Sequence, residues 1–322
     1  MSNDGTRWRA ISPNGTGGPG GGPGGGGPGG GGPGGGGGGQ WGAGTTALNY
    51  LGTDTTLYQD HYTLKKANKA NPWNDLVKVT DILENTPLAN LKDSLELYLD
   101  IDRTLWFLAS EIIFTDDDGY VYKGKQDYYV FKEQSTGQMI PMEFDGNSPM
   151  AMSKASSWSP FHNENNVNYP LLNRLLQVPS IRQRYLAHMR TIIAEELNQT
   201  AFDTRLDYYV SLIDTAVQND TKKLYSYADF QTEVNVLKNF VSTRRNTLNV
   251  NAEVSAAAPT ISSASHYTNN VQWARPNNNQ SVDVKATVTS SNGIDAVNIY
   301  YSGAINGQFE KALMYDDGNH ND

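Results

Sequence analysis

Apolar residues recur at helical spacings in two long parts of the chain. Between residues 74 and 114 a first apolar face consists of Leu76, Val79, Ile82 and Leu83. Asp100 has a side chain suited to the N-cap of a second helix. The inward positions of that helix would be Leu105, Leu108, Ala109, Ile112 and Ile113. With the same spacing over residues 170–248, the pattern predicts a large helical lobe whose apolar residues are mostly core.

Other segments alternate between apolar and polar residues, as strands do. Residues 47–66 fit one or two short strands, and residues 126–144 fit a hairpin that turns around residues 134–137. After residue 252 the composition shifts towards Ala, Ser, Thr and Asn. There, residues 281–288 and 296–302 alternate like strands of a β-sandwich. The pattern therefore predicts a second, all-β module that has room for only four or five strands.

A Gly- and Pro-rich tract interrupts these patterns near the N-terminus. Residues 15–39 contain 20 of the 32 glycines. Collagen needs Gly at every third position, and a P-loop needs a Lys followed by Ser or Thr, and the tract meets neither requirement. Because it offers no side chains to bury, we expect a disordered loop or linker.

Charge and composition exclude several classes of function. The chain of 322 residues has 25 Lys and Arg against 34 Asp and Glu, a net charge of -9, and no basic run, so nucleic acid is not an expected partner. The chain has no run of about 18 apolar residues, so no membrane span is predicted. The first 12 residues do not have the pattern of an export signal. Without cysteine, disulfides, thiol nucleophiles and Cys-ligated zinc are excluded.

The most informative polar residues are acids on either side of the predicted hairpin. Asp118 lies in the acidic loop 115–120, and Glu143 and Asp145 follow an apolar strand and precede Gly146. Phosphoryl transfer uses one carboxylate to orient the attacking hydroxyl and another to hold the metal that bridges the phosphates. Kinases present such acids around a small hairpin, which is the order found here.

Other interpretations of these acids remain open at this point. The acidic loop could be a polar turn, and Glu143 and Asp145 would share one face only if strand pairing continued past them. An EF-hand is excluded because Phe114 and Lys125 stand where its first and twelfth ligands belong. The five histidines are scattered and form no metal motif, and no G-x-S-x-G elbow is present.

Three stretches together resemble the CotH (spore-coat protein H) kinase-like family. They are LNYLGTDTTLYQDHYTLK (48–65) after the Gly-rich tract, LWFLASEIIFTDDDGY (105–120), and the strand pair DYYVF (127–131) and PMEFD (141–145). The likeness spans about residues 45–250. Each stretch is weak alone, and the combination is fairly specific.

The resemblance implies roles for particular acids. Asp118, before Gly-Tyr, corresponds to the catalytic base, and Asp145 corresponds to the ligand of Mg or Mn, with Glu143 and Asp127 as further metal ligands. The chain departs from the family pattern at three positions. Asp127 replaces an Asn, Glu143 replaces an Asp, and Met142 replaces a Trp. The first two changes keep oxygen ligands, and whether Glu143 or Asp145 is the main ligand stays open.

A kinase-like fold also needs strands over the nucleotide and a Lys for its phosphates. The family carries these before the Gly-rich tract, where this chain has only about a dozen residues. The small lobe is therefore expected to be truncated, or Met1 to be an internal start. Lys65 is the nearest basic candidate for contacting the nucleotide, with a solvated strand end as its alternative role.

The resulting prediction is an α+β chain of three parts. Residues 1–44 would be a small-lobe remnant with the Gly/Pro-rich loop, and residues 45–251 an atypical protein-kinase-like domain with a truncated small lobe and a mainly helical large lobe. Residues 252–322 would be a partial all-β Ig-like sandwich, because Tyr300-Tyr301 and residues 314–322 resemble modules of large bacterial surface proteins.

By resemblance, the expected function is transfer of phosphate from ATP, with Mg or Mn, to Ser or Thr of surface or coat proteins. The expected location is extracellular or at the cell surface. Two alternatives remain. One is a catalytically inert scaffold or adhesion module with the same fold, and the other is a structural protein that calcium stabilises through the acidic loops.

Overall fold

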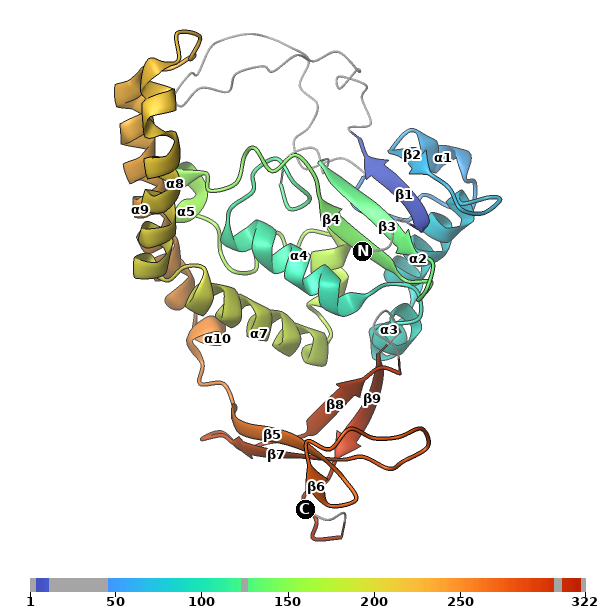
Figure 1. The fold of residues 1–322 in the computed structure, drawn as a ribbon. Coiled ribbons are helices and arrows are strands. Elements are labelled where there is room, and N and C mark those ends of the chain that lie inside the picture. The colour runs from blue at the N-terminus through green and yellow to red at the C-terminus, as the bar shows by residue number, and fades with distance from the viewer. Residues whose placement is uncertain (1–3, 12–45, 123–126, 304–308, 320–322) are drawn as a thin grey trace. The chain divides into compact units, whose positions relative to one another are not determined.

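The computed structural model describes residues 4–11, 46–122, 127–303 and 309–319 (Figure 1). Within this part the chain forms two compact units, Met1–Val254 and Ser255–Asp322. The first unit combines a small antiparallel sheet with most of the helices, and the second contains strands. The mixed α/β composition agrees with the sequence prediction, and the division falls a few residues after the predicted boundary.

The sheet of the first unit has the strand order β2-β1-β3-β4. Its strands are β1 (Gly5–Ala10), β2 (Tyr62–Lys66), β3 (Tyr128–Glu133) and β4 (Met139–Glu143). β3 and β4 are the predicted hairpin, so that prediction is confirmed. β1 was not predicted as a strand, and it lies centrally between β2 and β3. Trp8 and Ala10 of β1 are buried, while Arg7 and Arg9 alternate with them and are half-buried.

Four helices come before the hairpin along the chain. The first precedes β2, and the other three lie between β2 and β3. They are α1 (Thr56–Gln59), α2 (Trp73–Asn85), α3 (Leu88–Leu95) and α4 (Ile101–Ile113). α1 occupies part of the range that was predicted to be extended. The predicted cap of α4 is confirmed, because Asp100 accepts a hydrogen bond from the backbone N–H of Arg103 at 2.9 Å. The apolar faces predicted for α2 and α4 are buried in the core.

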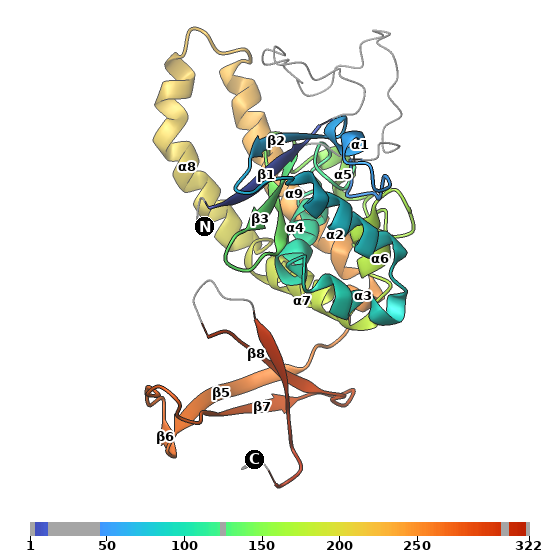
Figure 2. The same cartoon turned by 90° about the vertical axis from the view of Figure 1, so that its right-hand side faces the viewer.

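The remaining helices of this unit follow the hairpin. They are α5 (Met152–Ala155), α6 (Pro170–Leu175), α7 (Pro179–Glu195), α8 (Gln199–Asn219), α9 (Tyr227–Asn249) and α10 (Ala252–Ser255), which reaches the unit boundary. α4 packs against β4 on one side and α7 on another. α8 and α9 form a long hairpin, visible in Figure 1 and Figure 2. α4 is thus a central element that touches both the sheet and the helical lobe.

The second unit contains five strands in its described part. β5 (Thr260–Thr268), β6 (Val271–Gln272) and β7 (Asp283–Thr289) form one sheet, and β8 (Val297–Tyr301) pairs with β9 (Glu310–Met314). β7 and β8 confirm the two strands predicted from alternation. That these strands belong to an Ig-like sandwich stays a prediction.

Candidate functional site

The loop that follows α4 carries the predicted base, Asp118. Glu111, one turn before the end of α4, is 1% exposed, and its carboxylate accepts hydrogen bonds from the backbone N–H groups of Tyr120 (3.0 Å) and Val121 (2.8 Å). A Cβ at Gly119 would lie 2.7 Å from Oε1 of Glu111. The helix end and the loop are therefore in direct contact, and this contact sets the path of the chain through Asp118.

The other predicted acids lie at the open end of the β3–β4 hairpin. Asp127 immediately precedes β3, and Asp145 lies two residues beyond β4. The N–H of Phe144 donates to the carbonyl of Asp127 at 3.1 Å, so the two strands remain paired just past their ends. Asp127 and Asp145 both have a left-handed backbone, with φ of 56° and 57°, which is uncommon for residues other than Gly and is tolerated best by Asp and Asn.

Electrostatic interactions show that three of the predicted residues are neighbours. Burial, followed by the negative charges of Asp118 and Asp145, raises the pKa of Asp127 to about 6, and the positive charge of Arg9 opposes this rise. Nη2 of Arg9 lies 3.6 Å from Oδ1 of Asp127. The charges of Asp118 and Asp145 thus act on the carboxylate of Asp127, and Arg9, which the sequence analysis had not considered, lies beside the same carboxylate. The catalytic and metal-binding roles of these acids stay predictions.

Glu143 belongs to a different group of charges. Burial of its carboxyl group, and next the charge of Asp116, raises the pKa of Glu143 to about 8, although the residue as a whole keeps exposed surface at the end of β4. The pKa of Glu111 is raised by burial first and by Glu143 second. Glu143 and Asp145 therefore do not act as one pair on a strand face, because β4 ends at Glu143 and the backbone of Asp145 turns away.

Lys65, the predicted nucleotide contact, and Arg9 are both basic residues of the sheet. Lys65 lies exposed near the end of β2, at an irregularity in its pairing with β1. Arg9 lies on β1 and reaches the acids. The sequence analysis missed Arg9 because it assigns residues 1–44 to a remnant of the small lobe, without a strand. The alternation in GTRWRA (5–10) was the signal that could have revealed a strand with two arginines on one face.

The acids can be compared with what Mg or Mn requires. Within the described residues, no group of three or more His, Asp or Glu side chains is placed to hold a metal by itself. Mg²⁺ prefers oxygen ligands and is usually bound by only one or two carboxylates together with substrate phosphates. Two or three neighbouring carboxylates that repel one another fit a metal site completed by substrate phosphates. They do not fit a site in which protein side chains supply all the ligands.

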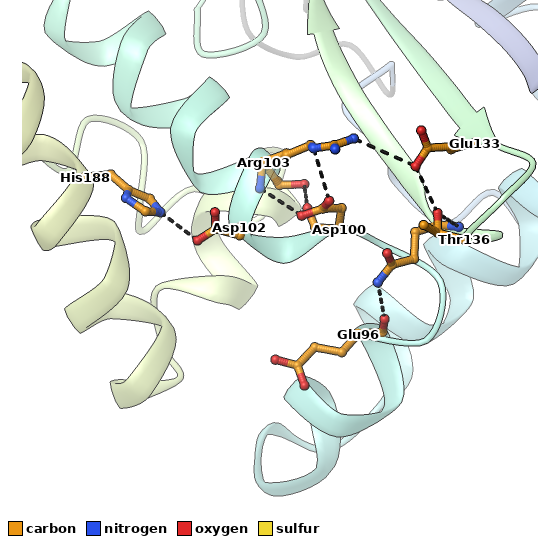
Figure 3. A network of polar contacts seen from close by, with 9 residues as sticks. Glu96, Asp100, Asp102, Arg103, Glu133, Thr136 and His188 are labelled. Carbon is orange, nitrogen blue, oxygen red and sulfur yellow. Dashed lines mark hydrogen bonds and ion pairs between the residues drawn. The ribbon is translucent and has the colours of Figure 1, made fainter. Parts of the chain in front are cut away.

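A second polar network lies at the other end of α4 (Figure 3). Nε2 of His188 on α7 contacts Oδ1 of Asp102 at 2.9 Å, and Arg103 lies 3.9 Å from Glu133 of β3. The ring of His188 stacks on Trp106 at a centroid distance of 4.1 Å. These contacts join α4 to α7 and to the hairpin, and no residue of the predicted site takes part in them. We assign this network a structural role.

His162 is a further polar residue in the interior of the helical lobe. Its ring stacks on Trp158 at 4.3 Å, and its Nε2 is buried with no hydrogen-bond partner among the described residues. Burial, then the positive charges of Arg244 and Lys154, lowers the pKa of His162 to about 4. The neutral ring is thus held by packing against Trp158.

A surface hollow of about 470 Å³ lies beside α2 and α3 and includes none of the predicted site residues. None of the helices in the described ranges is long and apolar enough to cross a bilayer. The acids at the end of the hairpin therefore remain the candidate site.

Fold and site together define a mixed α/β domain with an acidic cluster between a helix-end loop and the open end of a β-hairpin. The family described as CotH kinase protein matches residues 45–248, and the chain belongs to this family. The family predicted from the sequence is thus confirmed, and the family match suggests a kinase-like domain. Comparison with curated proteins gives no match.

Proposed function

We propose that this chain transfers phosphate from ATP to Ser or Thr hydroxyls of surface or coat proteins. One observation carries the proposal. In a chain of the CotH kinase family, Asp127 and Asp145 flank the open end of the hairpin, where the N–H of Phe144 donates to the carbonyl of Asp127, and the charges of Asp118 and Asp145 both act on Asp127. The proposed location of the protein is extracellular or at the cell surface, and its Ser255–Asp322 unit would be part of an Ig-like module.

Each acid has a proposed role in the reaction. Asp118 orients the acceptor hydroxyl and takes its proton. The carboxylate of Glu111 fixes the loop that carries Asp118 by accepting hydrogen bonds from its backbone N–H groups. Asp145 and Asp127 would hold Mg or Mn, which when bound supplies positive charge against the phosphates. Glu143 is the weaker metal ligand, because it shares its charge environment with Glu111 and Asp116. Lys65 remains a proposed nucleotide contact that lies outside this cluster.

The experiment compares three variants of the full chain with the wild type. Radiolabelled ATP and a Ser/Thr-rich surface protein serve as substrates, and calorimetry with MnATP measures binding. Asp118→Asn should reduce phosphoryl transfer by roughly 10²–10⁴-fold while MnATP still binds. Asp145→Ala should abolish that binding. Asp117→Asn, in the same loop, is the matched control and should keep both properties.

The alternative to catalysis is an inert surface scaffold with the same fold. A wild type that binds MnATP, phosphorylates no acceptor and behaves identically after Asp118→Asn would favour the scaffold. Equal binding of MnATP by Asp145→Ala and the wild type would remove Asp145 from the metal site. The two results separate an error in the reaction from an error in the ligand set.

A further inference from the structure

Arg9 is a basic side chain directed at the acidic cluster from a strand outside the matched family range. It lies on β1, opposite Tyr129 of β3, so both side chains are on the same face of the sheet. Its guanidinium lies 4.4 Å from the ring centroid of Phe144, which is the residue between Glu143 and Asp145. The ring of Phe144 in turn packs edge-on against Tyr129 at 4.8 Å. Arg9 is therefore positioned by packing.

Arg9 has hydrogen-bond donors that no residue of the described ranges satisfies. A guanidinium has five N–H donors arranged to fit a carboxylate or a phosphate with two parallel hydrogen bonds. The approach of Nη2 to Asp127 at 3.6 Å is longer than such a bond. Nε is buried and has no hydrogen-bond partner among the described residues. A buried donor without a partner costs free energy, and an anion at this place would satisfy it.

Charge balance points to the same conclusion. An arginine that only neutralised Asp127 would be expected to form a close bidentate pair with it. Instead, Nη2 of Arg9 stays 3.6 Å from Asp127. The guanidinium lies over the ring of Phe144, a position that suits a cation whose donors face another group. The carboxylates of Asp118, Asp127 and Asp145 would attract a metal ion, and the guanidinium of Arg9 would attract an anion bound next to that metal.

We infer that Arg9 binds a phosphate group of the nucleotide next to the metal held by Asp127 and Asp145. This inference rests on the proposed function, and it adds a phosphate ligand on β1 to the nucleotide contact proposed for Lys65 on β2. In the proposed arrangement, Arg9 weakens the binding of a free divalent cation, because both are positively charged. Once phosphate is present, Arg9 becomes favourable.

This dual effect gives two predictions of opposite sign for Arg9→Gln. Binding of MnATP should weaken by about 10- to 100-fold, since charge-assisted hydrogen bonds to phosphate are lost. Binding of Mn²⁺ alone should become about 2- to 10-fold tighter, since a nearby positive charge is removed. A role of Arg9 in holding Asp127 or in folding would change both affinities in the same direction.

The measurement is calorimetry on the full chain with Mn²⁺ alone and with MnATP. Arg9→Lys keeps the charge and loses the planar fork, so its MnATP affinity should lie between wild type and Arg9→Gln. Arg7→Gln is the matched control, because Arg7 is two residues away on the same face of β1, over Tyr129 at 5.1 Å, and its Nε is likewise buried without a hydrogen-bond partner among the described residues. Arg7 differs from Arg9 in making no ion pair with Asp127 in the described part of the chain. It should leave both affinities within about twofold of wild type.

Each outcome distinguishes the inference from the proposed function. If the wild type binds MnATP and Arg9→Gln binds it equally well, the inference is wrong and the proposed function stands. If the wild type binds no nucleotide, both are wrong. If Arg9→Gln does not fold, as circular dichroism would show, the Arg9→Lys comparison decides, and an affinity for MnATP equal to wild type overturns the bidentate phosphate contact.

Discussion

Arg244 of α9 offers the strongest test of how the helical lobe supports the site. The side chain is fully buried, and its guanidinium donates hydrogen bonds to carbonyl oxygens at two places. Ile112 (2.7 Å) and Ile113 (3.0 Å) are at the end of α4, and Ala155 (3.2 Å) and Trp158 (2.6 Å) are in the segment after the hairpin. A cation at the carboxyl end of a helix also interacts favourably with the helix dipole.

The expected effect of Arg244→Met follows from these contacts. Hydrogen bonds to a charged group contribute roughly 1.5–3 kcal/mol each after exchange with water, so four of them set an upper bound of roughly 6–12 kcal/mol. Burial lowers the pKa of Arg244 to about 10, which corresponds to a cost of about 3 kcal/mol for keeping the charge inside. Met recovers part of the packing and leaves the four carbonyls without this donor. We therefore expect a net loss of about 3–5 kcal/mol in unfolding free energy.

Urea titration of the full chain, followed by tryptophan fluorescence, measures this loss through the shift of the midpoint at constant slope. Arg245→Met is the matched control, because the neighbouring arginine is only half-buried and its Nη1 contacts one carbonyl, that of Leu197, at 3.2 Å. The control should lose about 1 kcal/mol or less. A loss for Arg244→Met below 1 kcal/mol, or one equal to the control, would refute the reasoning.

Three further changes test separate contacts by the same titration. Gly119→Ala should cost about 1–3 kcal/mol, because the new Cβ would meet the Glu111 carboxylate at 2.7 Å; an unchanged midpoint would contradict this close approach. Acidification from pH 6.5 to pH 4 should destabilise the wild type more than His162→Gln by about 1–2 kcal/mol, allowing for partial exposure, because the ring gains a proton only in the unfolded chain. Parallel pH curves would show that His162 does not contribute. Asp100→Ala should cost about 1 kcal/mol through loss of the helix cap, and an unaffected protein would show that the cap is not needed.

The parts of the fold that the sequence predicted are those set by local patterns. The helix after Asp100 has its apolar residues three and four apart, and the hairpin at 128–143 joins two alternating runs by a short turn. β1 was missed because its partners Tyr62–Lys66 and Tyr128–Glu133 are more than 50 residues away and a Gly-rich tract intervenes. Six residues of alternation carry too little signal when the pairing is non-local.

The candidate site divides in the same way. Asp118 and Asp145 could be predicted because the chemistry of phosphoryl transfer and the family pattern both require acids around the hairpin. Glu111 was missed because an acid within an apolar helix has no distinctive spacing, and its partners are backbone N–H groups that side-chain patterns do not reveal. Arg9 was missed for the same reason as β1. Residues that position a site through backbone contacts therefore need a structure.

Glu111 and Arg244 show how a distant helix can control the acidic loop. The carboxylate of Glu111 accepts hydrogen bonds from backbone N–H groups of the loop, and the guanidinium of Arg244 donates hydrogen bonds to the last carbonyl groups of α4. Because one helix end is fixed from both sides, the loop has little freedom to shift, and Asp118 is kept near Asp127 before any ligand binds. Such preorganisation lowers the free-energy cost of assembling a site during a reaction. A change at Arg244 that leaves the protein folded should therefore reduce the proposed phosphoryl transfer through the position of Asp118, even though Arg244 belongs to a helix more than 100 residues later in the chain.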